Sequence, residues 1–192
     1  MAVRDVTADT TNIYIDGLLK DFDTDPTTGT LDGDNVFYLG DFDGDNNATT
    51  GIEEFAGDLD EIKVYRLTMT SDQVKVEYNQ GKSQVMGSLS TNSSNLASNS
   101  STDSYCPPGQ GSACTGPVGE WKMDENTGTT LNDSTGNGNA STTWTGQPTW
   151  ATGKYGSGLN FDGNNSVVRI APATSTLANL GTTTDSYTVE AW

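Results

Sequence analysis

The segment DSYTVEAW (residues 185–192) alternates polar and apolar side chains and ends on Trp192. An alternation with a period of two predicts a β-strand that buries one of its faces. Strands normally run into a turn, yet no Gly, Pro, Asn or Asp follows Trp192. The pattern therefore predicts a strand that is cut short, and we expect Trp192 to be an internal residue of a longer protein.

The composition extends this prediction to the whole chain. The 192 residues are 32% hydrophobic and 18% charged and include 22 glycines, which is typical of loop-rich, all-β extracellular modules. Nine basic against 26 acidic residues give a formal net charge of −17. This charge repels phosphate backbones, so we expect no nucleic-acid partner. It attracts cations, so a divalent metal is the first small ligand to consider.

Membrane, export and cysteine signals set further limits. No apolar run approaches the roughly 18 residues of a membrane span, so we expect no membrane insertion. MAVRDVTADT (residues 1–10) has no signal-peptide core, so any export signal lies outside this chain. Cys106 and Cys114 bound a short loop, and two cysteines without any histidine make no zinc site. A disulfide between them would stabilise the fold by about 2–3 kcal/mol and imply an oxidising compartment; two free thiols are the alternative.

The chain divides into two β segments and a linker. NIYIDGLLKDF predicts a hairpin with a type I′ turn at Asp16-Gly17, and NVFYLG and EIKVYRL predict further strands. TSDQVKVEYNQG (residues 70–81) predicts a short helix, because Thr70 and Gln73 form a capping box and Gly81 suits the C-cap. Residues 83–117 are rich in Ser, Asn and Gly without periodicity, which predicts a flexible linker. A second β segment follows from residue 118.

Both β segments resemble parts of one known family. PVGEWKMDENTGTTLNDSTGNGNASTTW, PTWATGKYGSGLNFDGNNSVVRI and SYTVEAW resemble the opening half of a LamG-like domain. MAVRDVTADTTNIYIDG, FYLGDFDG and FAGDLDEIKVYRLTMTSDQVKVEYNQG resemble the closing half. The family belongs to the concanavalin A-like lectin/glucanase superfamily, so the resemblance implies an antiparallel jelly-roll β-sandwich.

The two halves stand in reversed order, and the central strands of the family are missing. We therefore expect residues 1–82 to be the C-terminal half of one module, residues 83–117 a linker with the Cys106–Cys114 loop, and residues 118–192 the N-terminal half of the next. Met1 is then an internal methionine or a cut. The alternative is a circularly permuted arrangement, in which the two halves pair in one sandwich and so remove long unpaired strand edges.

Acidic residues mark two candidate calcium sites. Asp41, Asp43 and Asp45 are spaced like the start of an EF-hand loop, but Asn46 and Ile52 stand where that loop needs Gly and Glu. This segment is therefore either a calcium loop of another kind or a solvated acidic tip. The family resemblance implies a second site from Asp60 and Asp162, with Asn164 or Asn165 as further donors. The alternative is that Asp162 caps a turn and Asp60 accepts backbone N–H groups.

Aromatic residues provide the candidate sugar contacts. Trp121 and Trp192 occupy alternating strand positions, so we expect both in the core. Trp144 and Trp150 flank the loop TGQP and are the candidate ligand-binding residues.

The sequence argues against catalysis. The paired-carboxylate motif of the glucanases in this superfamily is absent, and a chain without histidine excludes Ser-His-Asp and Cys-His chemistry. We expect a noncatalytic, calcium-stabilised adhesion module of an extracellular or cell-surface repeat protein. It would bind glycans or cell-surface polymers and associate with neighbouring copies. The alternative is a carbohydrate-binding accessory domain of a secreted glycoside-active enzyme.

Overall fold

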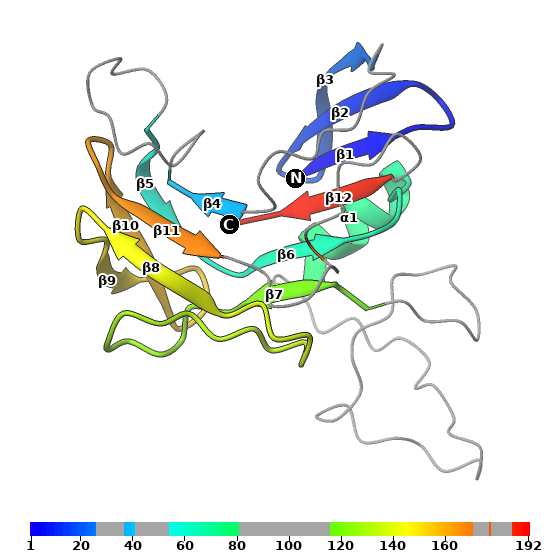
Figure 1. Ribbon diagram of the computed structural model, residues 1–192. Coiled ribbons are helices and arrows are strands. Elements are labelled where there is room, and N and C mark those ends of the chain that lie inside the picture. Colours follow the sequence, from blue (N-terminus) through cyan, green and yellow to red (C-terminus); the bar gives the residue numbers. More distant parts are fainter. Residues whose placement is uncertain (26–36, 41–53, 81–115, 171–176, 178–185) are drawn as a thin grey trace, which may run out of the picture.

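The computed structural model describes residues 1–25, 37–40, 54–80, 116–170, 177 and 186–192. Within them the chain forms antiparallel β-sheets and one short helix, α1 (Ser71–Gln80), which confirms the predicted all-β class (Figure 1). The strands are β1 (Ala2–Asp5), β2 (Thr10–Ile15), β3 (Leu18–Thr24), β4 (Phe37–Leu39), β5 (Ala56–Leu59), β6 (Ile62–Tyr65), β7 (Gly119–Trp121), β8 (Ser141–Thr145), β9 (Thr149–Thr152), β10 (Ser157–Asp162), β11 (Val167–Ile170) and β12 (Tyr187–Glu190).

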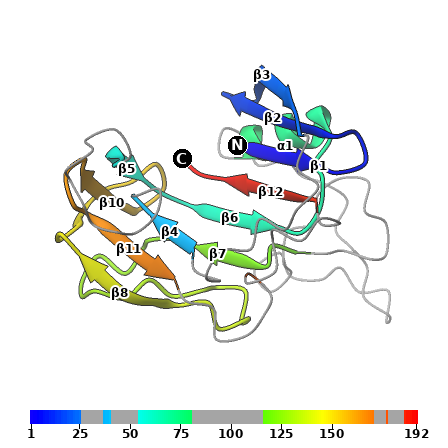
Figure 2. The ribbon, with the colours of Figure 1, turned by 45° about the horizontal axis from the view of Figure 1, so that its top comes forward.

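The largest sheet joins the two ends of the sequence. Its strand order is β3-β2-β1-β12-β6-β7, so β12 lies between β1 and β6. Val189 pairs with Ala2 on one side and with Val64 on the other. Figures 1 and 2 show the two chain ends near one another beside this sheet. Residues 187–190 of the segment therefore form a strand, as predicted, and this strand is internal to the sheet.

Two three-stranded sheets lie over one end of the large sheet, in the orders β5-β10-β9 and β4-β11-β8 (Figure 2). In each of them a strand of residues 1–82 pairs with strands of residues 118–192. The two β segments therefore pair within this one chain. None of their sheets is built from one segment alone.

The main apolar core lies between the large sheet and the two small ones. Ile62 and Val64 of β6 and Trp121 of β7 pack there with Phe161 of β10 and Ile170 of β11. Trp121 is fully buried, and its indole nitrogen donates to the Asn139 carbonyl oxygen at 2.8 Å. This confirms the core position predicted for Trp121.

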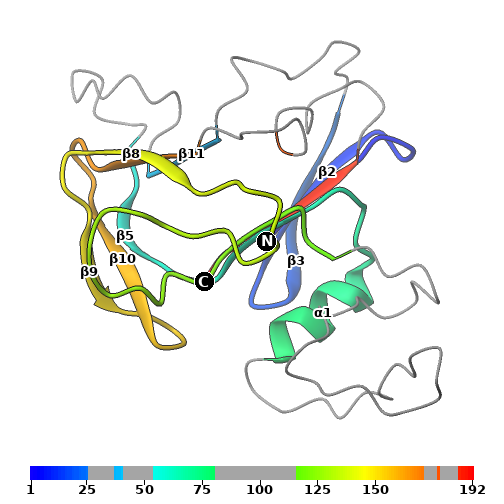
Figure 3. The same cartoon turned by 60° about the horizontal axis from the view of Figure 1, so that its bottom comes forward.

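Helix α1 covers the opposite face of the large sheet (Figure 3). Its start is the predicted capping box: the Thr70 N–H donates to Gln73 Oε1 at 2.8 Å, and the Gln73 N–H donates to Thr70 Oγ1 at 3.3 Å. Val74 of the helix packs on Val3 and Tyr65 of the sheet. The helix thus closes a second, smaller core.

The β2–β3 hairpin turns at Asp16 and Gly17, whose φ angles are 53° and 71°. Two consecutive positive φ values are those of a type I′ turn, as predicted. The hairpin buries Tyr14, which is 7% exposed, and leaves Ile15 at 55% exposure. Tyr14 is buried because its face of β2 lies against α1.

Trp192 is half-buried and lies outside both core clusters, so the core position predicted for it is wrong. Its backbone N–H and C=O exchange hydrogen bonds of 2.9 and 2.8 Å with Asp60. Most of the predicted linker lies outside the described residues, together with Cys106 and Cys114. No helix in the described ranges is long and apolar enough to span a membrane.

Candidate functional site

The structure brings Trp144 and Trp150 together. Trp144 is in β8 and Trp150 in β9, and their ring centroids are 5.6 Å apart at an interplanar angle of 47°. The indole nitrogen of Trp150 donates to the Gly128 carbonyl oxygen at 3.0 Å. Both contacts restrain the Trp150 ring, so it needs little reorganisation to act as a contact surface.

Trp150 lines an open groove of about 550 Å³ that we call the Trp150 groove. The other lining residues are small or polar: Asp124, Asn126, Ala151, Thr152, Gly156 and Ser157. Asp124 accepts a hydrogen bond from the Ser157 N–H at 3.2 Å. Gly156 has a φ of +69°, and a Cβ at this position would overlap Asp124 Oδ1. Glycine is therefore required beside this carboxylate.

Asp60 is a buried carboxylate beside the turn that contains Tyr155 and Gly156. Its residue exposure is 2%, and Oδ2 accepts the Tyr155 N–H at 2.7 Å, while Oδ1 has no hydrogen-bond partner. Burial raises the pKa of Asp60, the Tyr155 N–H opposes this, and the charge of Asp124 adds to it. An orphaned, buried carboxylate oxygen of this kind is suited to a cation.

Asp162 lies at the other end of the β5–β10 ladder. It is exposed and accepts the N–H groups of Asn164 and Asn165 at 3.2 and 3.4 Å, so it caps a turn. The Ser166 hydroxyl is the main reason why its pKa is lowered. Asp162 is four residues along β10 from Gly158, which contacts Asp60, a distance of about 13 Å at roughly 3.3 Å per residue. Asp60 and the Asp162–Asn165 turn therefore do not share one ion.

Asp41, Asp43 and Asp45 lie outside the described residues. Within the part of the chain that is described, no three or more acidic or cysteine side chains cluster as a metal site.

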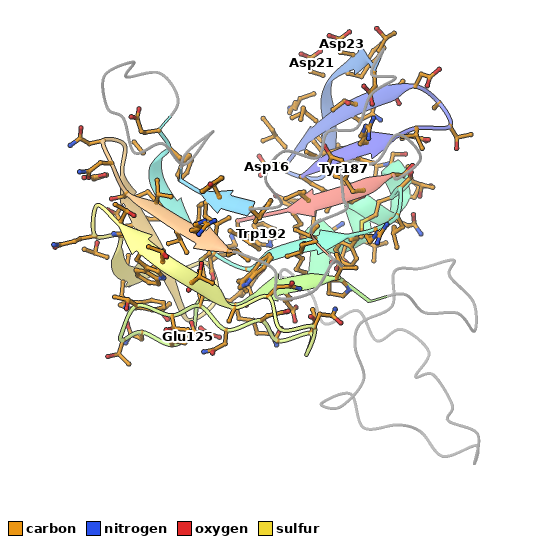
Figure 4. The ribbon with its side chains drawn as sticks, in the orientation of Figure 1. Asp16, Asp21, Asp23, Glu125, Tyr187 and Trp192 are labelled. Carbon is orange, nitrogen blue, oxygen red and sulfur yellow. The ribbon has the colours of Figure 1, made fainter. Side chains whose placement is uncertain are left out.

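A second pocket was not predicted from the sequence. It has a volume of about 360 Å³ and lies where β12, the β2–β3 turn and α1 meet; we call it the β12–α1 pocket. It is lined by Met1, Tyr14, Ile15, Asp16, Gly17, Val74, Tyr78, Glu190, Ala191 and Trp192. Figure 4 shows Asp16 at the end of the hairpin nearer to Trp192, with Asp21 and Asp23 farther along it.

Charged side chains are buried directly behind this pocket. Lys63 Nζ lies 3.7 Å from Glu77 Oε2 and 3.9 Å from Glu190 Oε2, and both of these oxygens lack a hydrogen-bond partner. Burial raises the pKa of Glu77 to about 7, and it also raises that of Glu190. The Glu77 side chain is fully buried, so only Glu190 of this pair reaches the pocket.

Comparison with protein-family models, curated proteins and solved structures found no match. The groove, the pocket and Asp60 are therefore the features of this chain that indicate a function.

Proposed function

We propose that this chain is a noncatalytic β-sandwich module that binds glycans through the Trp150 groove. The observation that carries the proposal is that Trp150, whose ring is restrained and packs partly against the main core, lines an open groove beside Asp124 and Asn126. A sugar ring has an apolar C–H face and a rim of hydroxyl groups. The indole offers an apolar surface, while carboxylate and amide groups bond to hydroxyls.

The shape of the groove fits a chain-like ligand. An open groove admits an internal unit of a polymer, whereas an enclosed cavity admits only an end. Among the described residues, Asp124 is the one carboxylate that lines it, and glycoside hydrolysis uses two carboxyl groups roughly 5–9.5 Å apart. We therefore propose binding without catalysis.

The proposed place of this module in a larger protein follows from the family resemblance. We propose a LamG-like, concanavalin A-like jelly roll in permuted order, placed in a repeat protein at the cell surface or outside the cell. It would act in adhesion, beside neighbouring copies. The pairing of both β segments in every described sheet supports a permuted sandwich. The second candidate setting is an accessory domain of a glycoside-active enzyme, and polysaccharide binding without cell binding would favour it.

Titration with neutral oligosaccharides of glucose, xylose, mannose and galactose tests the proposed site. We expect one series to bind and Trp150→Ala to weaken that binding at least tenfold. Asp124→Asn should weaken it several-fold, while Asp162→Asn, an exposed acid on another turn, should leave it unchanged. Binding that survives Trp150→Ala in a folded variant would refute the groove as the site.

We also propose that Asp60 holds a calcium ion that stabilises the fold. The orphaned Oδ1 of Asp60 and the nearby charge of Asp124 support this position. At a calcium concentration 100 times its Kd, the native state gains about 2.7 kcal/mol. Thermal unfolding with millimolar Ca²⁺ and with EGTA should differ in the wild type and coincide in Asp60→Asn. Coincident curves in the wild type would exclude a structural calcium ion.

A further inference from the structure

We infer that the β12–α1 pocket binds the ammonium group of an aliphatic amine, and that this site is separate from the Trp150 groove. Three observations support the inference: the pocket is preformed, a buried carboxylate lines it, and a second carboxylate lies at its mouth.

The carboxylate is Glu190. Its residue exposure is 4%, it lines the pocket, and its Oε2 has no hydrogen-bond partner. Lys63 is 3.9 Å from that oxygen, which is beyond hydrogen-bond distance. A buried acceptor without a donor is costly. An N–H donor from a ligand would satisfy it.

The second carboxylate is Asp16, at the mouth of the pocket. Asp16 is exposed, has a φ of 53° in the type I′ turn and is one of the residues that line the pocket. The adjacent Gly17 packs on Tyr78, and a Cβ at this glycine would lie 2.9 Å from the Tyr78 ring. Asp16 is thus held on a rigid turn.

Several charged groups lie in and around the pocket. Glu190 interacts electrostatically with Lys63, with the α-amino group of Met1 and with Glu120. Glu61 and Glu77 also act on Lys63. Of the charged groups, Asp16, Glu190 and the α-amino group of Met1 belong to residues that line the pocket, while Lys63 and Lys154 lie just outside this lining.

The apolar part of the lining would contact the stem of the amine. Tyr14, Ile15, Val74 and Ala191 are among the residues that line the pocket. A linear alkylammonium places its charge at one end and its methylenes along such a wall. A polar sugar lacks this division.

The rings in the pocket also favour an amine over a sugar. Trp192 stacks on Tyr78 at a centroid distance of 5.4 Å, and the Lys154 ammonium lies 5.3 Å from the Trp192 centroid. Trp192 therefore already has an ammonium partner of the kind inferred here. A sugar would have to displace one of these neighbours to stack on Trp192.

Calorimetric titration at pH 8 with n-pentylamine and 1-pentanol tests the inference, because these probes have the same length and differ in charge. We expect n-pentylamine to bind with a Kd on the order of 1 mM, a reasonable value for so small a ligand. The alcohol should bind at least tenfold more weakly. Equal binding of the two probes, or no binding of the amine, would overturn the inference.

Variants of the two carboxylates locate the site. Glu190→Gln should weaken amine binding at least tenfold, and Asp16→Asn, which tolerates the same positive φ, should weaken it several-fold. Asp21→Asn, on the same hairpin but outside the pocket, is the matched control and should bind as the wild type does. If Glu190→Gln does not fold, Asp16→Asn still decides. Wild-type affinity in Asp16→Asn would then refute the pocket.

Two further probes identify the source of the amine. We compare 1,5-diaminopentane, a free diamine, with Nα-acetyl-lysine N-methylamide, which presents a lysine side chain as a protein does. Tighter binding of the first indicates a free polyamine, and tighter binding of the second indicates a lysine of a partner protein. Trp150→Ala should retain amine binding. The proposal of an amine site and the proposal of a glycan groove can therefore be refuted independently of each other.

Discussion

The two faces of the six-stranded sheet differ sharply in what they bury. The face toward the small sheets buries Ile62, Val64 and Trp121 in an apolar core. The face toward α1 buries charged groups beside its smaller apolar core, with Lys63 between Glu77 and Glu190. Strand β6 contributes to both faces, because its side chains alternate between them.

The difference shows that one strand can contribute to stability through one face and to a pocket through the other. The apolar face gains free energy from burial alone. The charged part of the other face costs free energy to form, since each buried charge must be desolvated. It holds a pocket instead, and its buried carboxylate Glu190 faces that pocket.

The largest expected effect is on the apolar face. Trp121→Ala should lower the free energy of unfolding by about 3–5 kcal/mol, because it leaves a large cavity in the core. It also removes the 2.8 Å hydrogen bond to Asn139. Urea denaturation measures the change, with exposed Lys122→Ala as a control that should change little. A loss below 1 kcal/mol would mean that this face does not dominate stability.

The charged face should respond to pH. The pKa of Glu77 is about 7 in the fold because of burial, against 4.5 ordinarily. Between these values the unfolded chain releases the proton while the folded chain keeps it, so stability falls as pH rises, by roughly 3 kcal/mol for this group. Glu77→Gln should remove that part of the slope.

Thermal unfolding of wild type and Glu77→Gln from pH 4.5 to pH 8 checks this. The two should be alike at pH 4.5, and the variant should be more stable at pH 8. A residual slope is expected from Glu61, whose pKa burial also raises to about 7. A variant that is less stable than the wild type at pH 8 would show that the Glu77–Lys63 pair is stabilising.

A smaller effect should come from Asp133, which braces the loop behind Trp121. It accepts the N–H groups of Thr135 and Asn139 at 3.0 Å each. Asp133→Ala should cost about 2 kcal/mol near neutral pH, as expected when charged acceptors are lost. Burial raises the pKa of Asp133, but the Thr135 hydroxyl and these N–H groups lower it more.

Because the folded pKa of Asp133 is depressed, its contribution is present above pH about 4 and is lost as pH falls through the folded pKa. The difference between wild type and Asp133→Ala in denaturant titrations should therefore shrink at acid pH. A difference that stays constant down to pH 2 would argue against the hydrogen bonds as its cause.

The smallest effect should come from the cap of α1. Thr70→Ala removes the acceptor for the Gln73 N–H and should cost about 1 kcal/mol. Thr70→Ser keeps the oxygen and should cost little. Chemical denaturation compares the two, and equal losses would mean that the methyl group of Thr70 matters and the cap does not.

Local patterns in the sequence were enough to predict the local structure. The Asp16-Gly17 turn, the Thr70–Gln73 cap and the strand at 187–190 each depend on neighbouring residues, and the structure has all three. The proximity of Trp144 and Trp150 follows from a short loop between their strands.

The charged cluster and its pocket could not be predicted in this way. Lys63, Glu77 and Glu190 come from β6, α1 and β12, and no local motif relates them. The burial of Tyr14 in place of Ile13 and Ile15 has the same origin. Alternation shows that a strand has two faces, and only tertiary packing decides which face is buried.

The position of β12 between β1 and β6 also bears on how the chain folds. The pairing of Ala2 with Val189 closes a loop of nearly the entire sequence. Closing such a loop costs entropy before any contact repays it, and folds rich in distant pairings reach the native state slowly, in roughly milliseconds to seconds. During synthesis, β1 and β6 cannot pair with β12 until residues 187–190 have left the ribosome. Until then, β1 and β6 present open edges to other chains.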